Sequence, residues 1–463
     1  MDVLEAKPKS AEEASRSIRV YLIELLEKIR QKSRIPGIAI TVSIQGIRCE
    51  AAIGELAEGG VEPMSVDARF QIGCITKPMV AMVAAEFVAD GRLDPDARIS
   101  RYIPELADID VTRELSVWHL LSHTSGVQGL NINDPAVAYS YNWDKFLAHL
   151  RGTRRLFTPG SVFSYDHSEY ALVGEIVERI SGCKIGELLR THIVEPLGLT
   201  TGTVRGDQQL VDRCVVDHTP DSSAGTFRKL KPIPFGAFWR ASLSDLTMSL
   251  SDILRIAEAI PGISRSTAGR PTPEAMELVQ KQVLQLPAMF GSARAEQLPA
   301  SFGLGCAAYR GSLLGHNGSA RGQTCGFRFD PRAGFALAVG LNSWQPYLRD
   351  KIINHVMGVL RGQSIPPAPR AQLELPVDDL PGTYYGPGAV EARVVQSGAG
   401  GLSCSVTAPG QPQPLVVDMR ADEKFGLVVS SDTQHHSLAF FREPESGIHG
   451  LMFGMTALRK GAQ

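Results

Sequence analysis

Two residues at the start of an expected helix have the types and spacing of a nucleophile and its base. Cys74 and Lys77 stand three positions apart in FQIGCITKPM, where a short strand is expected to lead into a helix that ends near Ala89. Free backbone N–H groups and the dipole at a helix N-terminus stabilise a thiolate or an oxyanion. Residues three apart share a helix face, so the Lys77 amine can accept the proton of the sulfur. Alone, such a pair is more often a cysteine beside an exposed lysine on a buried helix.

Two further segments contain residues that could assist this nucleophile. Tyr165-Asp166-His167 precedes an expected helix, and a tyrosine near a lysine can have a lowered pKa and act as a general base or proton relay. His316-Asn317-Gly318 is expected at a strand edge, where it could line a cleft and bind an extended substrate. A loop tyrosine and a strand-end histidine are the simpler explanations of each segment taken alone.

The elements that would position these residues follow from hydrophobic periodicity and turn signals. The pattern predicts a helix over 11–33, a hairpin of strands 38–43 and 48–53, and a strand over 68–72 before Cys74. Strands return near the end of this region, so an antiparallel sheet joins its two ends and the fold class is α+β. Further helices are predicted over 116–121, 143–150, 168–180, 186–192, 249–260 and 351–360, with strands over 311–314, 324–330 and 335–341.

A second domain is predicted at the C-terminal end. The segment 364–372 includes the proline-rich IPPAP sequence and is interpreted as a linker after a catalytic domain over 1–363. Residues 373–463 alternate in short strands with Gly and Pro turns, which favours a small antiparallel β-barrel.

Composition narrows the partners and the cellular location. The chain has 463 residues, of which 43% are hydrophobic, and its net charge of −2 gives no long-range attraction to nucleic acid or anionic lipid. We expect a small-molecule or peptide acyl substrate, no nucleic acid and no membrane. The mixed-charge start, MDVLEAKPKSAEEASRSIR, shows no signal peptide, so the expectation is a cytoplasmic protein.

Cysteine and histidine spacing gives no metal signature. The seven cysteines are scattered without a CxxC pair, and we expect neither a metal nor a cofactor. His435-His436 lies in an expected barrel turn and is a poor metal candidate. His119 and His123 are expected to fix a loop by hydrogen bonds. Trp239 could line the mouth of the cleft, as aromatic side chains often do.

Together the motifs resemble those of a known superfamily. The order Cys-xx-Lys, Tyr-x-His, His-x-Gly is similar to that of the serine β-lactamases and penicillin-binding proteins, in the class C-like branch that includes esterases, D-amino-acid peptidases and acyltransferases. The resemblance covers about Arg19 to Leu360 and implies a β-lactamase-like antiparallel sheet flanked by helices, with an all-helical subregion. It rests on FQIGCITK, DGRLDPDARISRYIPEL, VWHLLSHTSGV, PGSVFSYDHSEYALVGEIVE, EPLGLTTG and GHNGSARGQTCGFRFDPRAGFALAVGLN.

The resemblance assigns a role to each matching residue. Cys74 would attack the acyl carbon, Lys77 would deprotonate it, and Tyr165 would carry the proton to the leaving group and later activate the acceptor. His167 stands where the family usually has an asparagine that binds the acyl-side amide of the substrate. This replacement puts that mode of recognition in question, and a histidine could act as an extra base.

The same resemblance assigns the opposite wall of the cleft. His316 and Gly318 would line it, with Asn317 between them in the same motif. The backbone N–H groups of Cys74 and Ser319 would form the oxyanion hole.

The cysteine in place of serine directs the functional hypothesis. Its adduct would be a thioester, which reacts readily with amines, so we expect an acyltransferase or thioesterase acting on an acyl or peptidyl thioester or ester. Some peptide-cyclising thioesterases that resemble penicillin-binding proteins have a lipocalin-like domain after the catalytic one. Release and cyclisation of a non-ribosomal peptide, presented by a carrier protein, would fit. The alternatives are an esterase or D-amino-acid peptidase using the same residues, and a non-catalytic binding module on the same fold.

Overall fold

A computed structural model gives the fold. It describes residues 10–461, except for gaps at 133, 205–212, 222–224, 232–235, 244–245, 261–270, 288–297, 311–312, 363–374, 399–400, 409–412, 423–425, 430–437, 445 and 454. The predicted linker 364–372 and the pair His435-His436 therefore lie outside the described residues.

The larger part of the chain is built on an antiparallel sheet that joins its two ends, as predicted. The first strand in the sequence pairs with the strand that ends this region, with Ile38 opposite Leu341. The neighbours in the sheet, in order, are β2 (Ile47–Gly54), β1 (Gly37–Ile44), β13 (Phe335–Leu341), β12 (Gln323–Asp330), β11 (Leu313–Ala320), β10 (Ala307–Tyr309), β9 (Ser301–Gly303) and β8 (Gln282–Gln285).

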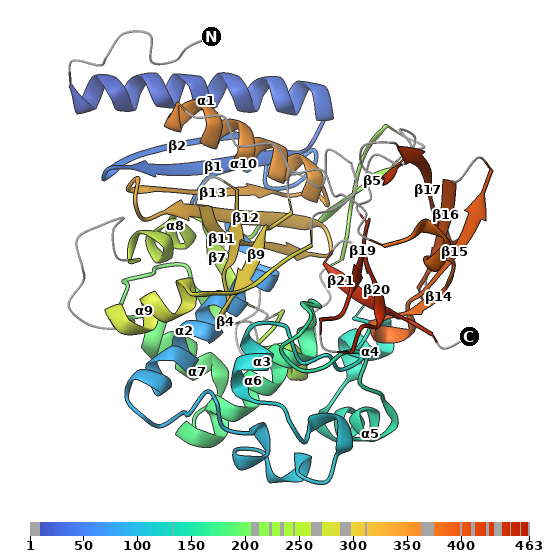
Figure 1. The fold of residues 1–463 in the computed structure, drawn as a ribbon. Helices are drawn as coiled ribbons and strands as arrows, with labels where there is room; N and C mark the ends of the chain where they lie inside the picture. Colours follow the sequence, from blue (N-terminus) through green and yellow to red (C-terminus); the bar gives the residue numbers. More distant parts are fainter. Residues whose placement is uncertain are drawn as a thin grey trace.

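Helices cover both faces of this sheet. Helices α1 (Ala11–Ser33) and α10 (Pro346–Arg361) lie together on one face, and α8 (Leu250–Glu258) packs on the other (Figure 1). The Ser10 side chain caps α1 by accepting from the Glu13 N–H, and Arg34 ends the helix in the left-handed conformation. These caps explain why the predicted bounds of α1 match the observed ones. In contrast, α10 begins five residues before the predicted 351, because Pro346 is tolerated in the first helical turn.

A helical region lies beyond α8, around a central helix. That helix, α2 (Thr76–Ala89), is apolar on all sides, and its residues from Thr76 to Phe87 are buried. The surrounding helices are α3 (Val117–Leu121), α4 (Pro135–Ser140), α5 (Trp143–Gly152), α6 (His167–Ser181), α7 (Ile185–Leu189) and α9 (Pro273–Gln280). Helix α9 and strands β8 to β10 were not predicted from the sequence.

Short strands β3 (Arg69–Gln71), β7 (Leu246–Ser249) and β4 (Thr203–Val204) form a separate small sheet. Strand β3 leads towards Cys74, as predicted. A further hairpin consists of β5 (His218–Asp221) and β6 (Thr226–Lys229).

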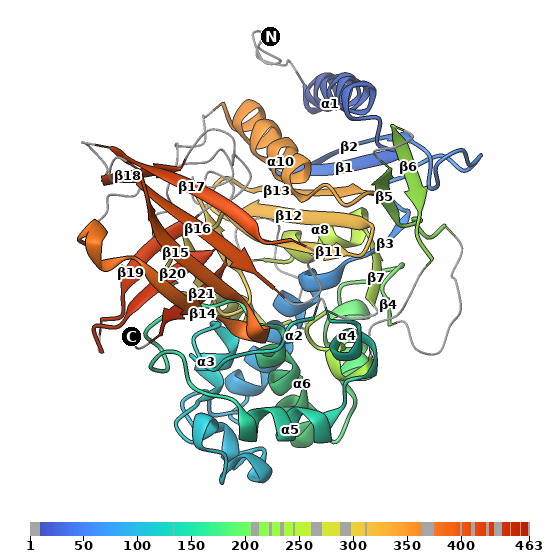
Figure 2. The same cartoon turned by 90° about the vertical axis from the view of Figure 1, so that its right-hand side faces the viewer.

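The C-terminal strands form a curled antiparallel sheet that lies against the first part of the chain (Figure 2). In the described residues its strand order runs from β18 to β19, which makes a half-barrel where a barrel was predicted. The order is β18 (Gly426–Val429), β17 (Leu415–Asp422), β16 (Gly401–Thr407), β15 (Glu391–Ser397), β14 (Gly382–Tyr385), β21 (Thr456–Lys460), β20 (His449–Phe453) and β19 (Leu438–Arg442).

Candidate active site

Cys74 lies where the small sheet meets the central helix. It is the middle residue of the 3-10 turn η1 (Gly73–Ile75), which runs directly into α2, and its thiol is free and partly exposed. Gly73 has a φ of +52°, and a Cβ there would lie 2.4 Å from the carbonyl oxygen of Ser319. A glycine is therefore required for the nucleophile turn to reach the backbone of β11.

Gly318 has the same packing role from the other side. A Cβ on Gly318 would lie 1.9 Å from the carbonyl oxygen of Ile72 and 3.0 Å from Cγ1 of Ile75. The glycine of the His-x-Gly motif therefore holds β11 against η1. The backbone of Ser319, the next residue, lies against Gly73, and the oxyanion pair of Cys74 and Ser319 stays a prediction.

Lys77 is buried and has two polar partners in the site. Its side chain is fully buried, and Nζ lies 2.8 Å from the Ser242 carbonyl oxygen and 2.9 Å from Nδ1 of His167. Burial lowers the pKa of Lys77, although the Cys74 thiolate within hydrogen-bonding reach acts in the opposite direction. A general base needs the neutral amine, and Lys77 therefore becomes neutral at a lower pH than a free lysine does.

Tyr165 lies beside both of these residues. Lys77 Nζ is 4.8 Å from the centre of the Tyr165 ring. The ring is partly exposed, but the hydroxyl oxygen is buried and has no protein hydrogen-bond partner among the described residues. Burial, with the nearby Cys74 thiolate, raises the pKa of Tyr165 well above 10.0. The expectation of a lowered pKa was wrong, because burial disfavours the charged phenolate and the nearby thiolate repels it, so the neutral phenol is favoured.

Two histidines complete the cluster as neutral groups. Burial lowers the pKa of His167 well below 6.5, and the Lys77 charge acts in the same direction. His316 is buried, its Nδ1 lies 2.6 Å from the Asn317 carbonyl oxygen, and burial lowers its pKa to about 3. The rings of His316 and Tyr165 are 6.1 Å apart, so the third motif reaches the site as predicted.

Two residues predicted from the sequence lie elsewhere. Asn317 points to the opposite face of β11, because side chains alternate along a strand, and its amide donates to Asp350 on α10 over 3.2 Å. Trp239 has no exposed surface, and its indole N–H donates to the Val137 carbonyl oxygen over 2.8 Å. The tryptophan therefore supports the helical region and does not line the cleft mouth.

The structure adds a buried acid–base pair beneath Tyr165. His123 is fully buried, its Nδ1 lies 2.5 Å from Oε2 of Glu169, and its ring is 4.4 Å from that of Tyr165. Burial raises the pKa of Glu169 well above 4.5. The sequence predicted that His123 and His119 fix a loop by hydrogen bonds. The bond to Glu169 confirms this role for His123. For His119 it is confirmed by a second bond, in which its Nδ1 accepts from the Ser116 N–H over 3.0 Å.

The C-terminal sheet also touches the site. The Tyr165 N–H donates to the Met455 carbonyl oxygen over 2.9 Å, and the Ala457 N–H donates to Oγ of Ser164 over 3.1 Å. Met455 and Ala457 flank the turn between β20 and β21. The interface contains an apolar cluster, whose buried side chains are Leu156, Phe157, Val162, Phe163, Phe302, Ala307, Ala439, Met452 and Ala457.

Neither a metal cluster nor a membrane helix is found in the described part of the chain. No group of three or more His, Cys, Asp or Glu residues there has the geometry to hold a metal ion. No helix among the same residues is both long and apolar enough to cross a bilayer.

A cysteine three residues before a buried lysine, with a tyrosine and a central strand beside them, is similar to the site arrangement of the serine β-lactamases and penicillin-binding proteins, with cysteine in the place of serine. The sequence profile of the Beta-lactamase family matches residues 22–359, and the chain belongs to this family. Its relatives include penicillin-binding proteins, esterases and carboxypeptidases, so the family is one of acyl-transferring hydrolases.

Individual comparisons agree with this assignment. The chain is 26% identical to penicillin-binding protein 4 of Amycolatopsis lactamdurans over 78% of its own length and 96% of that protein. It is 28% identical to esterase EstB of Burkholderia gladioli over 37% of its length and 48% of that protein. The crystal structure of SurE has a similar fold, with a TM-score of 0.74, 23% identity and coverage of 96% of this chain and 99% of that one.

Proposed function

We propose that this protein is a cysteine-dependent acyltransferase or thioesterase that acts on a peptidyl or acyl thioester or ester. The observation that supports it is the setting of Lys77, a buried amine between the Ser242 carbonyl and His167, with Cys74 within reach. Burial of a cation is unfavourable. A buried lysine with two fixed partners is therefore not expected in a site that has lost its catalytic function.

The partners of Lys77 determine what its amine can do. A neutral amine has two N–H donors, which Ser242 and Nδ1 of His167 accept, and one lone pair, which is left for the Cys74 proton. After proton transfer the ammonium has three donors, for Ser242, His167 and the thiolate. Both protonation states are therefore satisfied without movement of the lysine, which makes Lys77 suited to be the base.

Acylation and deacylation follow from this geometry. The Cys74 sulfur attacks the acyl carbon, the oxyanion is stabilised by the N–H groups of Cys74 and Ser319, and the proton of the thiol goes to Lys77. Tyr165 donates its proton to the departing thiolate or alkoxide and is reprotonated through Lys77. In the second half, an acceptor amine attacks the Cys74 thioester and the carbon–sulfur bond breaks. The amine loses one proton as the amide forms, and that proton restores the Cys74 thiol.

The chemistry of the adduct favours transfer to an amine. A thiol exchanges with a thioester substrate at little thermodynamic cost, and an amine converts the resulting thioester to a more stable amide. If that amine is the N-terminus of the same acyl chain, the product is a cyclic peptide. A carrier protein that presents the chain as a thioester would supply such a substrate.

The test is the intact mass of the protein after brief exposure to a short peptidyl thioester of N-acetylcysteamine, with products followed in parallel. We expect a transient adduct on the wild type, none on Cys74→Ala, and amide or cyclic product in excess over free acid. Free acid as the main product, with an amine present, would favour an esterase or peptidase. No adduct with any D- or L-ended donor would contradict the catalytic reading and favour a binding module.

A further inference from the structure

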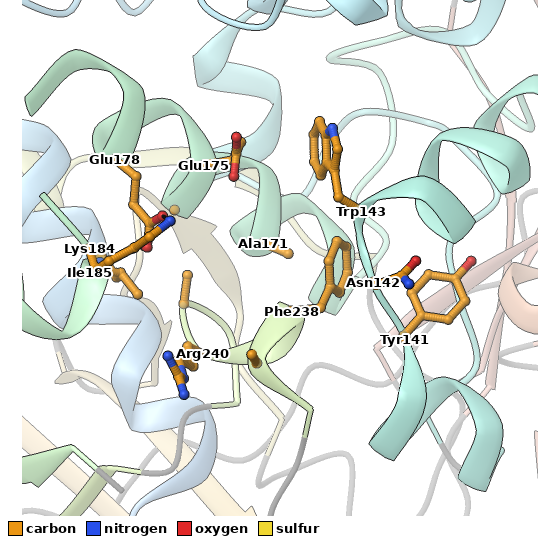
Figure 3. A pocket seen from close by; sticks show the side chains of 13 residues that line it. Tyr141, Asn142, Trp143, Ala171, Glu175, Glu178, Lys184, Ile185, Phe238 and Arg240 are labelled. Carbon is orange, nitrogen blue, oxygen red and sulfur yellow. Dashed lines mark hydrogen bonds and ion pairs between the residues drawn. The ribbon is translucent and has the colours of Figure 1, made fainter. Parts of the chain in front are cut away.

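A cavity of about 360 Å³ lies in the helical region, behind the catalytic lysine. Its walls come from α6, from the start of α5, from Lys184 and Ile185 at the start of α7, and from η6 (Ala237–Trp239) with the two residues that follow. Figure 3 shows that the aromatic residues lie on one side and that Arg240, Glu178 and Lys184 lie on the other. The cavity therefore has an apolar wall facing a charged one.

The apolar wall is held in place by ring packing. Phe238 contacts Tyr141 edge to face at 5.5 Å between ring centres, and it packs on Phe146 at 5.0 Å and on buried Trp239 at 4.8 Å. Such contacts fix the ring of Phe238 before any ligand arrives. A ligand with a flat or branched apolar group would find a preformed surface, which reduces the entropy lost on binding.

Among the described residues, one cation of the charged wall has no counter-ion. Glu178 is paired with Lys184 over 2.7 Å and also accepts from the Ile185 N–H, while Glu175 is paired with Arg179 over 2.7 Å. Among the described residues no carboxylate pairs with Arg240, and its Nε is buried without a hydrogen-bond partner. A buried donor left unpaired is unfavourable, so an anion that accepted from Arg240 would bind with a gain.

We propose that this cavity binds a small monocarboxylate that carries an aromatic or branched apolar group, the class to which apolar amino acids and their N-acyl derivatives belong. The carboxylate pairs with Arg240, and the apolar group packs against Phe238 and Trp143. Planar guanidinium groups bind carboxylates through two parallel hydrogen bonds, which gives this pairing its specificity.

The site is connected to catalysis through one short segment. Ala241 lines the cavity, and the next residue, Ser242, accepts the hydrogen bond of Lys77. A Cβ on Gly174 would lie 2.4 Å from that of Ala241, so α6 and this segment are in tight contact. A ligand that shifts Ala241 therefore also moves the carbonyl that orients the base, and occupancy of the cavity changes the reactivity of Cys74.

Calorimetric titration of the full chain tests the binding, with 3-phenylpropionate as the probe and 3-phenylpropan-1-ol as its uncharged counterpart. We expect the acid to bind at least tenfold more tightly than the alcohol, and Arg240→Gln to remove this difference while Arg240→Lys keeps part of it. Tyr165→Phe, in the active site, should leave the affinity unchanged. Ala171→Leu, which fills the cavity and leaves Arg240 in place, should abolish binding of both compounds.

Three results would overturn the proposal: no binding at millimolar concentration, equal affinity in Arg240→Gln, or loss of affinity in Tyr165→Phe, which would place the probe in the active site. Circular dichroism and thermal midpoints of each variant show whether a loss is due to misfolding.

The coupling between the cavity and the active site is measured by the rate at which iodoacetamide alkylates Cys74. We expect 3-phenylpropionate to change this alkylation rate at least twofold in the wild type and not at all in Ala171→Leu. An unchanged rate in the wild type would contradict the coupling. None of these measurements requires turnover, so failure of this proposal can be distinguished from failure of the proposed acyl transfer.

Discussion

The backbone N–H of Tyr165 donates a hydrogen bond to the carbonyl oxygen of Met455, 2.9 Å away. One residue belongs to the catalytic cluster, and the other follows strand β20 of the C-terminal sheet. The backbone position of Tyr165 therefore depends in part on the C-terminal sheet. Any change that loosens the C-terminal sheet should appear first as a change in catalysis.

Glu443 offers a test of this coupling. Its carboxylate is buried and accepts from the Thr158 N–H over 2.5 Å, from Oγ of Ser161 over 2.7 Å and from Ser446. Burial acts to raise the pKa of Glu443, but these hydrogen bonds hold it below its ordinary value. Glu443→Leu leaves the Thr158 N–H unpaired, and we expect a loss of about 1–3 kcal/mol in the free energy of unfolding.

The catalytic effect of Glu443→Leu should exceed its effect on substrate affinity. We expect kcat to fall about tenfold with KM nearly unchanged, because misplacement of Tyr165 weakens proton donation in the transition state. Glu443→Gln, which keeps an acceptor oxygen, is the matched control and should retain most activity. Equal kinetics for the leucine and glutamine variants would show that the C-terminal sheet does not position Tyr165.

His167 is expected to act as an acceptor for Lys77. His167→Asn restores the residue usual in the family, and its amide oxygen can still accept from the Lys77 amine. We expect that variant to acylate within about tenfold of the wild type, whereas His167→Leu should lose roughly 100-fold, within the range of general-base effects. Burst-phase acylation rates measure both. A leucine variant as fast as the asparagine variant would contradict the role of His167 in holding the base.

The pH dependence of acylation should report the lowered pKa of Lys77. Acylation needs the neutral amine, so its rate should rise with pH through a midpoint below 10.5. Ionisation of the thiol could imitate this rise, so the profile should be repeated on Cys74→Ser with an activated ester, because a serine hydroxyl does not ionise in this range. The same rise in both proteins identifies Lys77 as the base. A midpoint near 10.5 in the serine variant would exclude a perturbed lysine.

Gly318→Ala should separate η1 from β11. The added Cβ would lie 1.9 Å from the Ile72 carbonyl oxygen, which is main-chain and cannot rotate away. We expect loss of the oxyanion geometry and at least a ~100-fold fall in kcat, comparable to removal of an oxyanion donor. Gly152→Ala is the control, since nothing lies within 4 Å of a Cβ there. Activity within about threefold of wild type for Gly318→Ala would show that β11 does not form the oxyanion wall.

The buried histidine His316 should make the fold sensitive to acid. Its folded pKa of about 3 lies below the ordinary 6.5, so the unfolded chain binds a proton between these values and the folded chain does not. Stability from this group is present above pH 6.5 and is lost as pH falls towards 3, by at most about 1.4 kcal/mol per pH unit. Urea titrations of the wild type and His316→Gln at pH 7 and pH 5 measure the difference. Parallel slopes against pH would contradict it.

Local patterns were enough to predict the main elements. The stripe of Ile18, Leu22 and Leu26 identified α1, and the Gln45-Gly46 turn identified the first hairpin, because both signals are short-range properties of the chain. The same is true of Cys74 in η1 and Lys77 in the first turn of α2, whose spacing of three residues brings the two side chains within reach of each other. The short strands β8 to β10 lack such a signal and exist because β11 offers them an edge.

The sequence by itself determined the family, the nucleophile segment and the order of the motifs, because each is written in residues close together along the chain. Only the tertiary structure decided where the predicted site residues lie, what they contact and how their pKa values shift. It turned Asn317 away from the site, buried Trp239, raised the pKa of Tyr165 and placed the Ser242 and Met455 carbonyls against Lys77 and Tyr165. Desolvation and backbone hydrogen bonds depend on which distant segments pack together, and no local spacing of residues contains that information.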